Sequence, residues 1–387
     1  MTLADAARAH GLGQVKAAPD RPSVKIDPAT GEGTAEAVVR RTDEFDALLA
    51  KMLPDVPVDV LEVTEVRAWG HPDDPYQYVK ARVRRRLDGG KTGRELLRAI
   101  PRRRARKATA DVAGERTLVV NFSDVQVGKA TEDGGGTEET IARVRSVAGQ
   151  LPDRVASMKR MGRSISRIVV ANLGDMGEGT CQNYSAQPFR IDLNESDQMA
   201  VAMDLLDDLV DVCAGLVPEV ICTVVNSNHD RPRDGGKYVT DESDSRAFTV
   251  HRALARAYAK NPERYGHVTW HIPEDPLVST LDLHGVGVAF IHGHEATRGA
   301  TPQAKVWNWW GGQLEGRLPA GNCSVLLSGH FHHFAVLEQQ GRTMLMSPSL
   351  DGGSRWLRNV SGVWSDPGML VCTVDSDGVD DIKVLRP

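Results

Sequence analysis

The chain has 387 residues, of which 41% are hydrophobic, and its mean hydropathy is −0.33. These values predict a globular protein with one large domain and a smaller one. A reducing cytoplasm is the location we expect, because the chain has no recognisable secretory signal and its cysteines are scattered. No apolar run approaches the roughly 20 residues of a membrane span, and the first residues lack the apolar core of a secretory signal. The five cysteines form no CxxC pair, which argues against a zinc ribbon or a disulfide framework.

The formal net charge of −5 is unevenly distributed. Residues 80–107 contain thirteen Lys and Arg against two acids, a local charge of +11, so the rest of the chain carries −16. A strongly basic segment on an acidic body indicates a polyanionic partner, with nucleic acid first. The alternative is a solvated linker whose charge only maintains solubility.

The amino-terminal third reads as three segments. Residues 1–33 are an irregular lead-in, residues 34–90 a small accessory α+β domain, and residues 91–112 a basic linker. In the accessory domain we expect a helix over 34–53 and strands over 58–69 and 78–86, which form a β-hairpin. One face of the hairpin and the linker supply the expected nucleic-acid contacts: Lys80, Arg82, Arg84, Arg102, Arg103 and Arg104.

From residue 113 onward, short apolar runs alternate with amphipathic segments. We expect helices over 137–161, 194–216 and 244–259, the second of them N-capped by Asn194. The strands expected are 118–122, 168–173, 220–225, 267–271, 287–291, 323–327, 343–347, 369–374 and 380–385. βαβ units followed by a β-rich half predict an α/β protein, a layered sandwich with mixed sheets. The aromatic run Trp307–Trp310 either stacks on bases or packs a helix on a sheet.

Polar clusters occur where five of the apolar runs end. They are 123–126 (SDVQ), 174–178 (GDMGE), 226–230 (NSNHD), 292–295 (HGHE) and 329–333 (GHFHH). The carboxyl ends of strands form the ligand-binding edge of α/β sheets, and Asp, Asn and His are metal ligands. Each cluster alone is also compatible with turn chemistry, but five in succession favour a metal centre.

The last cluster is the richest in histidine. In an extended backbone His330 and His332 would point to the same side, as a metal pair requires, whereas the alternative is a histidine-rich surface loop. His333 is expected to be exposed or to lie behind the ligands.

The order of the clusters resembles that of the calcineurin-like metallophosphoesterase superfamily, whose signature is D-x-H, G-D-x-x-D/E, G-N-H-D/E, a single His and G-H-x-H. The resemblance covers residues 117–350 and departs from the signature at Gln126, in place of His, and at Ser227, in place of Gly. It implies an α/β/β/α sandwich, so that residues 113–387 form the catalytic domain.

The resemblance also implies a centre of two divalent metal ions, with Mn²⁺ favoured over Mg²⁺, Zn²⁺ or Fe. Asp175 would bridge the ions. Asp124, His332 and Gln126 would hold the first, although an amide oxygen is a weaker ligand than imidazole. Asn228, His330 and either His292 or His294 would hold the second. His229 would donate a proton to the leaving oxygen, oriented by Asp230; the alternative is a structural histidine.

The resulting hypothesis is a metal-dependent phosphoesterase that acts on nucleic-acid phosphodiesters, similar to the repair-nuclease branch of bacterial or phage type. A phosphatase or phosphodiesterase for a small molecule or a phosphoprotein is the first alternative. A binding scaffold that has lost turnover is the second, suggested by Gln126. The sequence leaves open whether the chain forms a homo-oligomer or joins a repair or replication partner.

Overall fold

The computed structural model describes residues 23–26, 33–40, 61–69, 76–85, 92–99, 116–131, 134–180, 183–184, 187–353 and 364–387. The chain divides into two compact units. Met1–Asp88 and Tyr184–Phe189 form the first, and Gly89–Asn183 and Arg190–Pro387 form the second. In the described part of the chain, no helix combines the length and the apolar character needed to cross a membrane.

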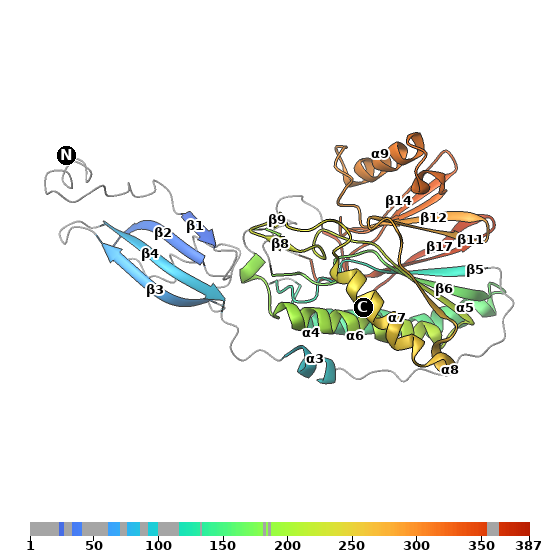
Figure 1. Cartoon of the computed structure of the whole chain (residues 1–387), viewed down its shortest axis with the longest axis horizontal. Helices are drawn as coiled ribbons and strands as arrows, with labels where there is room; N and C mark the ends of the chain where they lie inside the picture. Colours follow the sequence, from blue (N-terminus) through green and yellow to red (C-terminus); the bar gives the residue numbers. More distant parts are fainter. Residues whose placement is uncertain are drawn as a thin grey trace. The chain divides into compact units, whose positions relative to one another are not determined.

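The first unit contains an antiparallel sheet in the order β1-β2-β4-β3 (Figure 1). Its strands are β1 (Ser23–Ile26), β2 (Gly33–Arg40), β3 (Leu61–Trp69) and β4 (Tyr76–Arg85). The predicted pairing of the last two is confirmed, and β1 lies in the segment predicted to be irregular. The helix predicted over 34–53 is wrong for residues 34–40, which form β2 and pair with β4 along its length; the remainder lies outside the described residues.

Strand β4 alternates as predicted where its side chains are described. Val79 and Ala81 are buried, Lys80 is half-buried and Arg82 is exposed. The register pairs Lys80 with Glu36 on β2 and with Arg67 on β3, and it pairs Arg82 with Thr34 on β2 and with Glu65 on β3. Each of these two basic positions therefore has one acidic position beside it. The side chain of Arg84 and residues Arg102, Arg103 and Arg104 lie outside the described part of the chain. Of the basic linker predicted over 91–112, residues 93–99 form a helix, and residues 100–112 lie outside the described part.

The second unit is built on two sheets. The six-stranded sheet has the order β10-β7-β6-β5-β16-β17, and the five-stranded sheet has the order β11-β12-β13-β15-β14. The first comprises β5 (Arg116–Phe122), β6 (Ile165–Asn172), β7 (Glu219–Val224), β10 (Val268–His271), β16 (Met369–Asp375) and β17 (Gly378–Leu385). The second comprises β11 (Val278–Leu283), β12 (Val286–Ile291), β13 (Val325–Ser328), β14 (Ala335–Gln339) and β15 (Arg342–Met346). Each sheet contains both parallel and antiparallel pairs.

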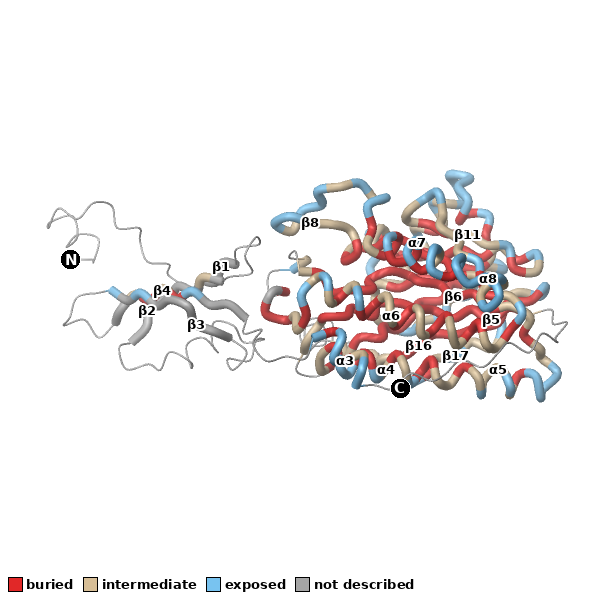
Figure 2. Tube along the Cα trace, turned by 60° about the horizontal axis from the view of Figure 1, so that its bottom comes forward, coloured by how far each residue is buried: buried red, intermediate tan, exposed pale blue. Residues whose placement is uncertain are grey.

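Alternation along single strands places the sheets in layers. In β5, Leu118 and Val120 join the core beneath the helices, whereas Val119 joins the core between the two sheets. In β13, Leu327 faces the same inter-sheet core and Leu326 faces the core on the other side. The predicted α/β/β/α sandwich is therefore confirmed, and Figure 2 shows β5, β6 and β16 buried within it.

Helices cover the outer faces of both sheets (Figure 1). The six-stranded sheet packs against α4 (Thr137–Ala148), α5 (Leu151–Arg160), α6 (Glu195–Ala214) and α7 (Arg246–Ala259). Helix α3 (Gly93–Ala99) packs on α4 and α6. The five-stranded sheet packs against α9 (Pro302–Glu315). In α9 the indole of Trp310 is fully buried and donates to Ala320 O at 2.8 Å, which supports the packing interpretation of the tryptophan run.

Local signals placed several helices correctly. Asn194 caps α6 by accepting from the N–H of Asp197 at 3.0 Å, as expected for an Asn before a helix. The helix predicted over 137–161 is two helices, since α4 ends at Ala148 and α5 begins at Leu151 with Pro152 in its first turn. Helix α9 was anticipated only by the packing interpretation of the tryptophan run, and the strands β11 and β14 were not predicted.

Candidate metal centre

The side chains of the candidate site follow the ends of five strands. Asp124 follows β5, Asp175 follows β6, Asn228 follows β7, His292 follows β12 and His330 follows β13. The strands β5, β6 and β7 are parallel neighbours, as are β12 and β13, so their carboxyl ends lie at one edge of each sheet. The fold thus brings together clusters that are more than 200 residues apart in the chain.

The backbone at this edge is strained. Nine non-glycine residues in the described part of the chain have a positive φ, and five of them belong to the candidate site: Asp124, Gln126, Asp175, His330 and His332. Such conformations cost of the order of 1 kcal/mol or more each and persist where the surrounding structure enforces them, which is typical of functional sites. The extended geometry predicted for His330 and His332 is wrong, because their φ values are 68° and 59°.

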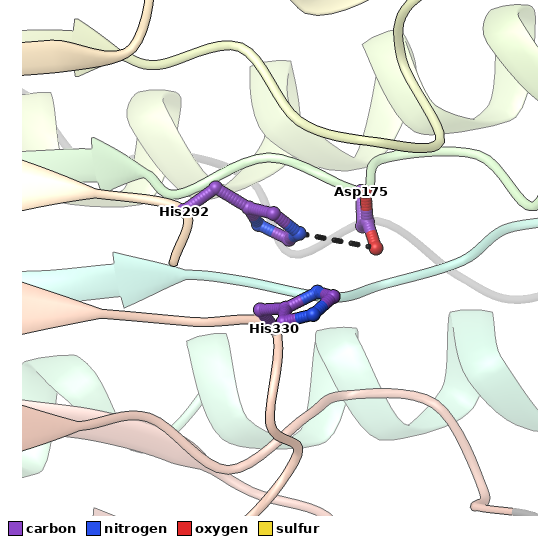
Figure 3. Close-up of side chains that lie close together, drawn as sticks. All are labelled: Asp175, His292 and His330. Atoms are coloured by element: carbon purple, nitrogen blue, oxygen red, sulfur yellow. Dashed lines mark ion pairs between the residues drawn. The ribbon is translucent and has the colours of Figure 1, made fainter. Parts of the chain in front are cut away.

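Asp175 is the residue that two groups of possible ligands share. One group is Asp175, His292 and His330, and the other is Asp124, Asp175 and His332. Within each group the ligand atoms lie within 4.8 Å of one another, close to the ~3–4 Å that ligands bound at about 2.0–2.2 Å from one ion adopt. Figure 3 shows Asp175, His292 and His330 converging from three different segments. Carboxylate and imidazole donors of this kind suit Mn²⁺, Zn²⁺ and Fe.

The ring of His292 is fixed for binding through one nitrogen. Its Nδ1 lies 2.7 Å from the carbonyl oxygen of Leu173, to which an N–H at this position donates. Its Nε2 then points to Asn228 Oδ1 at 2.9 Å and Asp175 Oδ2 at 3.4 Å. This is the arrangement of a metal-binding imidazole, whose second nitrogen is held by a backbone or carboxylate oxygen. His294 lies outside both groups, with Nδ1 3.0 Å from Glu295 Oε1.

The ring of His332 is held from the other side by a carboxylate that the sequence analysis did not single out. Its Nε2 lies 3.2 Å from Asp124 Oδ1, and its Nδ1 lies 3.6 Å from Asp351 Oδ1. Asp351 is fully buried and receives bonds from Ser349 Oγ at 2.6 Å and from the N–H of Gly353 at 3.0 Å. No motif marks Asp351, which lies in a Ser-Leu-Asp-Gly loop that reads as an ordinary turn.

Electrostatics separate the acidic and basic members of the site. Burial alone raises the pKa of Asp175, but the neighbouring His292 and His229 outweigh it and hold that pKa well below its ordinary value. Burial lowers the pKa of His292, but Asp175 outweighs it and raises that pKa to about 9. Burial, aided by His292, lowers the pKa of His330 to about 3. The carboxylate of Asp175 is therefore ionised at neutral pH and can bind cations.

His229 lies beside the shared carboxylate and is not part of either group. Its backbone N–H donates to Asp175 Oδ1 at 3.0 Å, and its Nε2 lies 4.0 Å from Asp175 Oδ2. Its Nδ1 lies 2.7 Å from Glu178 O, which orients the ring and leaves Nε2 directed toward the site. Asp230, which we expected to orient this ring, instead accepts from Ser227 Oγ at 2.7 Å.

Gln126 is placed at the site but has another partner. Its side chain is 4% exposed, and its Oε1 lies 2.6 Å from Lys129 Nζ. Lys129 also forms an ion pair with Asp351. Sequence reasoning passed over Lys129 because a lysine in a loop carries no metal signature, and its acidic partner lies 222 positions away.

Comparison with known proteins adds little to this geometry. No protein-family model matches the chain, and no curated protein matches it. Among solved structures, a predicted phosphoesterase from Streptococcus pneumoniae is similar at 13% identity and a TM-score of 0.29, covering 68% of this chain and 86% of that chain. Vps29 with Zn²⁺ from Entamoeba histolytica is similar at 12% identity and a TM-score of 0.32, and the match covers 70% of this chain and 98% of that chain. An archaeal phosphodiesterase is similar at 9% identity and a TM-score of 0.31, and the match covers 70% of this chain and 99% of that chain. At this level of similarity, function has to be inferred from the side chains of the site.

Proposed function

We propose that the chain is a metal-dependent phosphoesterase with two divalent ions. The observation that carries the proposal is the pair of Asp/His groups that share Asp175. Asp124, Asp175 and His332 would hold one ion, and Asp175, Asn228, His292 and His330 would hold the other. Two divalent ions at such a site supply Lewis acidity and a water of lowered pKa.

The protein's own residues supply orientation and proton transfer. Leu173 O and Asp351 fix the rings of His292 and His332, so that a phosphoester oxygen would meet a preorganised positive site. His229 Nε2 is the nitrogen directed toward the site, and in its protonated form it would donate to the oxygen that leaves. Glu178 O would keep the other ring nitrogen engaged during that transfer.

For the substrate, we favour a nucleic-acid phosphodiester. The support is the charge of +11 over residues 80–107 in a chain that is otherwise acidic, because Lys and Arg neutralise phosphates without reading sequence. The acidic positions of β2 and β3 lie beside the basic positions of β4 and would weaken its attraction for phosphate groups. Most of the affinity for nucleic acid would therefore come from the basic residues that follow β4 in the sequence. Manganese is the metal we favour for the two groups.

The substrate is tested with labelled single- and double-stranded DNA, incubated separately with Mn²⁺, Mg²⁺ and Zn²⁺. We expect cleavage that EDTA abolishes and that the Asp175→Asn variant lacks. A small aryl phosphodiester assayed in parallel separates the two parts of the proposal. Hydrolysis of the aryl ester without cleavage of any DNA would reject the nuclease assignment and retain the phosphoesterase.

A further inference from the structure

The ammonium group of Lys129 is held inside the protein next to the candidate metal centre. Only 12% of its side chain is exposed. Gln126 and Lys129 are the ends of a tight turn, closed by a bond from the N–H of Lys129 to Gln126 O at 3.0 Å. The turn returns the lysine side chain over the glutamine, and Nζ lies 2.6 Å from Gln126 Oε1. Gln126 therefore offers its only side-chain acceptor oxygen to a cation of the protein itself.

Asp351 holds the same ammonium from the opposite side. One carboxylate oxygen contacts Lys129 Nζ, while the other receives the bonds from Ser349 and Gly353 and lies 3.6 Å from His332 Nδ1. The loop that carries Asp351 is itself anchored, because Arg143 Nε donates to Leu350 O at 3.1 Å. Lys129 is thus joined through the carboxylate of Asp351 to His332. His332 is a candidate ligand in the group formed by Asp124, Asp175 and His332, called the Asp124 group below.

Both members of this pair are charged. Lys129 Nζ and Asp351 Oδ2 form an ion pair in which both side chains are largely buried, and a buried charge is stable only beside a partner of opposite sign. Burial alone lowers the pKa of Lys129, but the negative charges of Asp351 and Glu178 outweigh burial and raise that pKa above its ordinary value. Asp124 makes a smaller contribution in the same direction.

A positive charge at this position changes what the Asp124 group can bind. A divalent ion that took Gln126 Oε1 as a ligand would come within a few ångströms of the ammonium, and like charges this close in a buried site repel strongly. The group around His292 and His330 has no lysine or arginine contact of this kind among the described residues. The two halves of the centre are therefore electrostatically unequal.

We infer that Gln126 is not a metal ligand: with Asp351 it holds Lys129 as a fixed cation beside Asp124, Asp175 and His332, so this group binds a divalent ion more weakly than Asp175, His292 and His330. The inference deepens the proposed function and rests on it for the assignment of the metal-binding groups. The charge of Lys129 is paired with that of Asp351, and both are present whichever metal ions are bound.

The test is a titration of the metal-free full chain with Mn²⁺, with free Mn²⁺ read from its electron paramagnetic resonance signal. It measures binding and no catalysis, so a chain that bound metal but hydrolysed nothing would reject the proposed function and leave this inference standing. We expect two classes of sites whose dissociation constants differ by tenfold or more. The variants His332→Ala and His330→Ala assign them: the first should remove the weaker class and the second the tighter class.

The decisive variants are Lys129→Met and Gln126→Ala. The first removes the cation, and we expect it to tighten the weaker class by tenfold or more. The second removes only the amide, and we expect the dissociation constant of that class to stay within threefold of the wild-type value. A loss of tenfold or more in Gln126→Ala would identify Gln126 as a ligand and overturn the inference, as would an unchanged weaker class in Lys129→Met. If Lys129→Met does not fold, the result for Gln126→Ala alone decides between the two outcomes.

Discussion

Ser227 connects two acidic residues of the site. Its Oγ accepts a hydrogen bond from the backbone N–H of Asp175 at 2.8 Å and donates one to Asp230 Oδ2 at 2.7 Å. All three residues are buried. The Cβ of Ser227 also fills the space next to Gly174, where an added Cβ would come within 2.4 Å of it. Ser227 therefore has a structural role of its own and does more than provide a permissive backbone.

We predict that Ser227→Ala lowers the free energy of unfolding by about 1–3 kcal/mol, because it leaves the N–H of Asp175 and the carboxyl of Asp230 without this partner. Denaturation in urea measures the change. Ser243→Ala is the control. Because Ser243 is exposed, this substitution should change the free energy of unfolding by less than about 0.5 kcal/mol. Equal stability of Ser227→Ala and the wild type would show that the position requires only a permissive backbone.

Removal of the shared carboxylate should affect both metal groups at once. We predict that Asp175→Ala retains less than one tenth of the wild-type Mn²⁺ after dialysis, because Asp175 belongs to both groups. His330→Ala should lose one ion and keep the other. Atomic emission of dialysed protein measures both. If Asp175→Ala kept a full complement of metal, the two-group arrangement would be wrong.

His229 should matter for turnover and not for metal binding. We predict that His229→Ala lowers kcat by about 10²–10⁴-fold, the usual contribution of a general acid, with Mn²⁺ content unchanged. His267→Ala is the matched control, because His267 contacts Ala214 O and is not part of the site. Unchanged metal-stimulated hydrolysis in His229→Ala would remove His229 from the mechanism.

His251 should make stability sensitive to acid. It is fully buried between Asn172 and Trp270, and burial lowers its pKa from 6.5 to about 3. Between these values the unfolded chain binds a proton at this position and the folded chain does not. The free energy of unfolding therefore falls as the pH falls below 6.5, by ~2 kcal/mol at pH 5 from this group alone.

The variant His251→Gln isolates this contribution. We predict a smaller difference in unfolding free energy between pH 7 and pH 5 for the variant than for the wild type, whatever the absolute stability of the variant. Urea denaturation at both pH values measures the two differences. Equal pH dependence in the two proteins would mean that His251 has the same pKa in the folded and the unfolded chain.

The sequence was most informative where the governing interactions are local. Asn194 caps its helix through the residue three positions later, and the apolar runs that became β5 and β6 are buried on both faces. The proximity of the polar clusters in the fold could also be predicted, because parallel neighbouring strands end at the same edge of a sheet. These signals sufficed for the four-layer architecture and for the residues that the structure gathers around Asp175.

Long-range pairing decided the rest. Residues 34–40 have apolar positions that fit a helix stripe as well as a strand, and their pairing with β4, about 40 residues away, selects the strand. The partners of Gln126 were hidden for the same reason, since Asp351 approaches Lys129 only in the folded chain. A Cβ added at Gly329 would lie 2.4 Å from Ser123 Oγ and 2.6 Å from Asp124 Oδ2, so this position before His330 requires glycine because of residues about 200 positions away.

The most direct test of the central claim is the hydrolysis of bis(4-nitrophenyl) phosphate by the full chain, first depleted of metal and then supplied with Mn²⁺. A site built from two Asp/His groups around Asp175 should be inactive after depletion, active with Mn²⁺, and inactive in the Asp175→Asn variant under the same conditions. Hydrolysis that persisted without metal, or that was equal in Asp175→Asn and the wild type, would contradict the account.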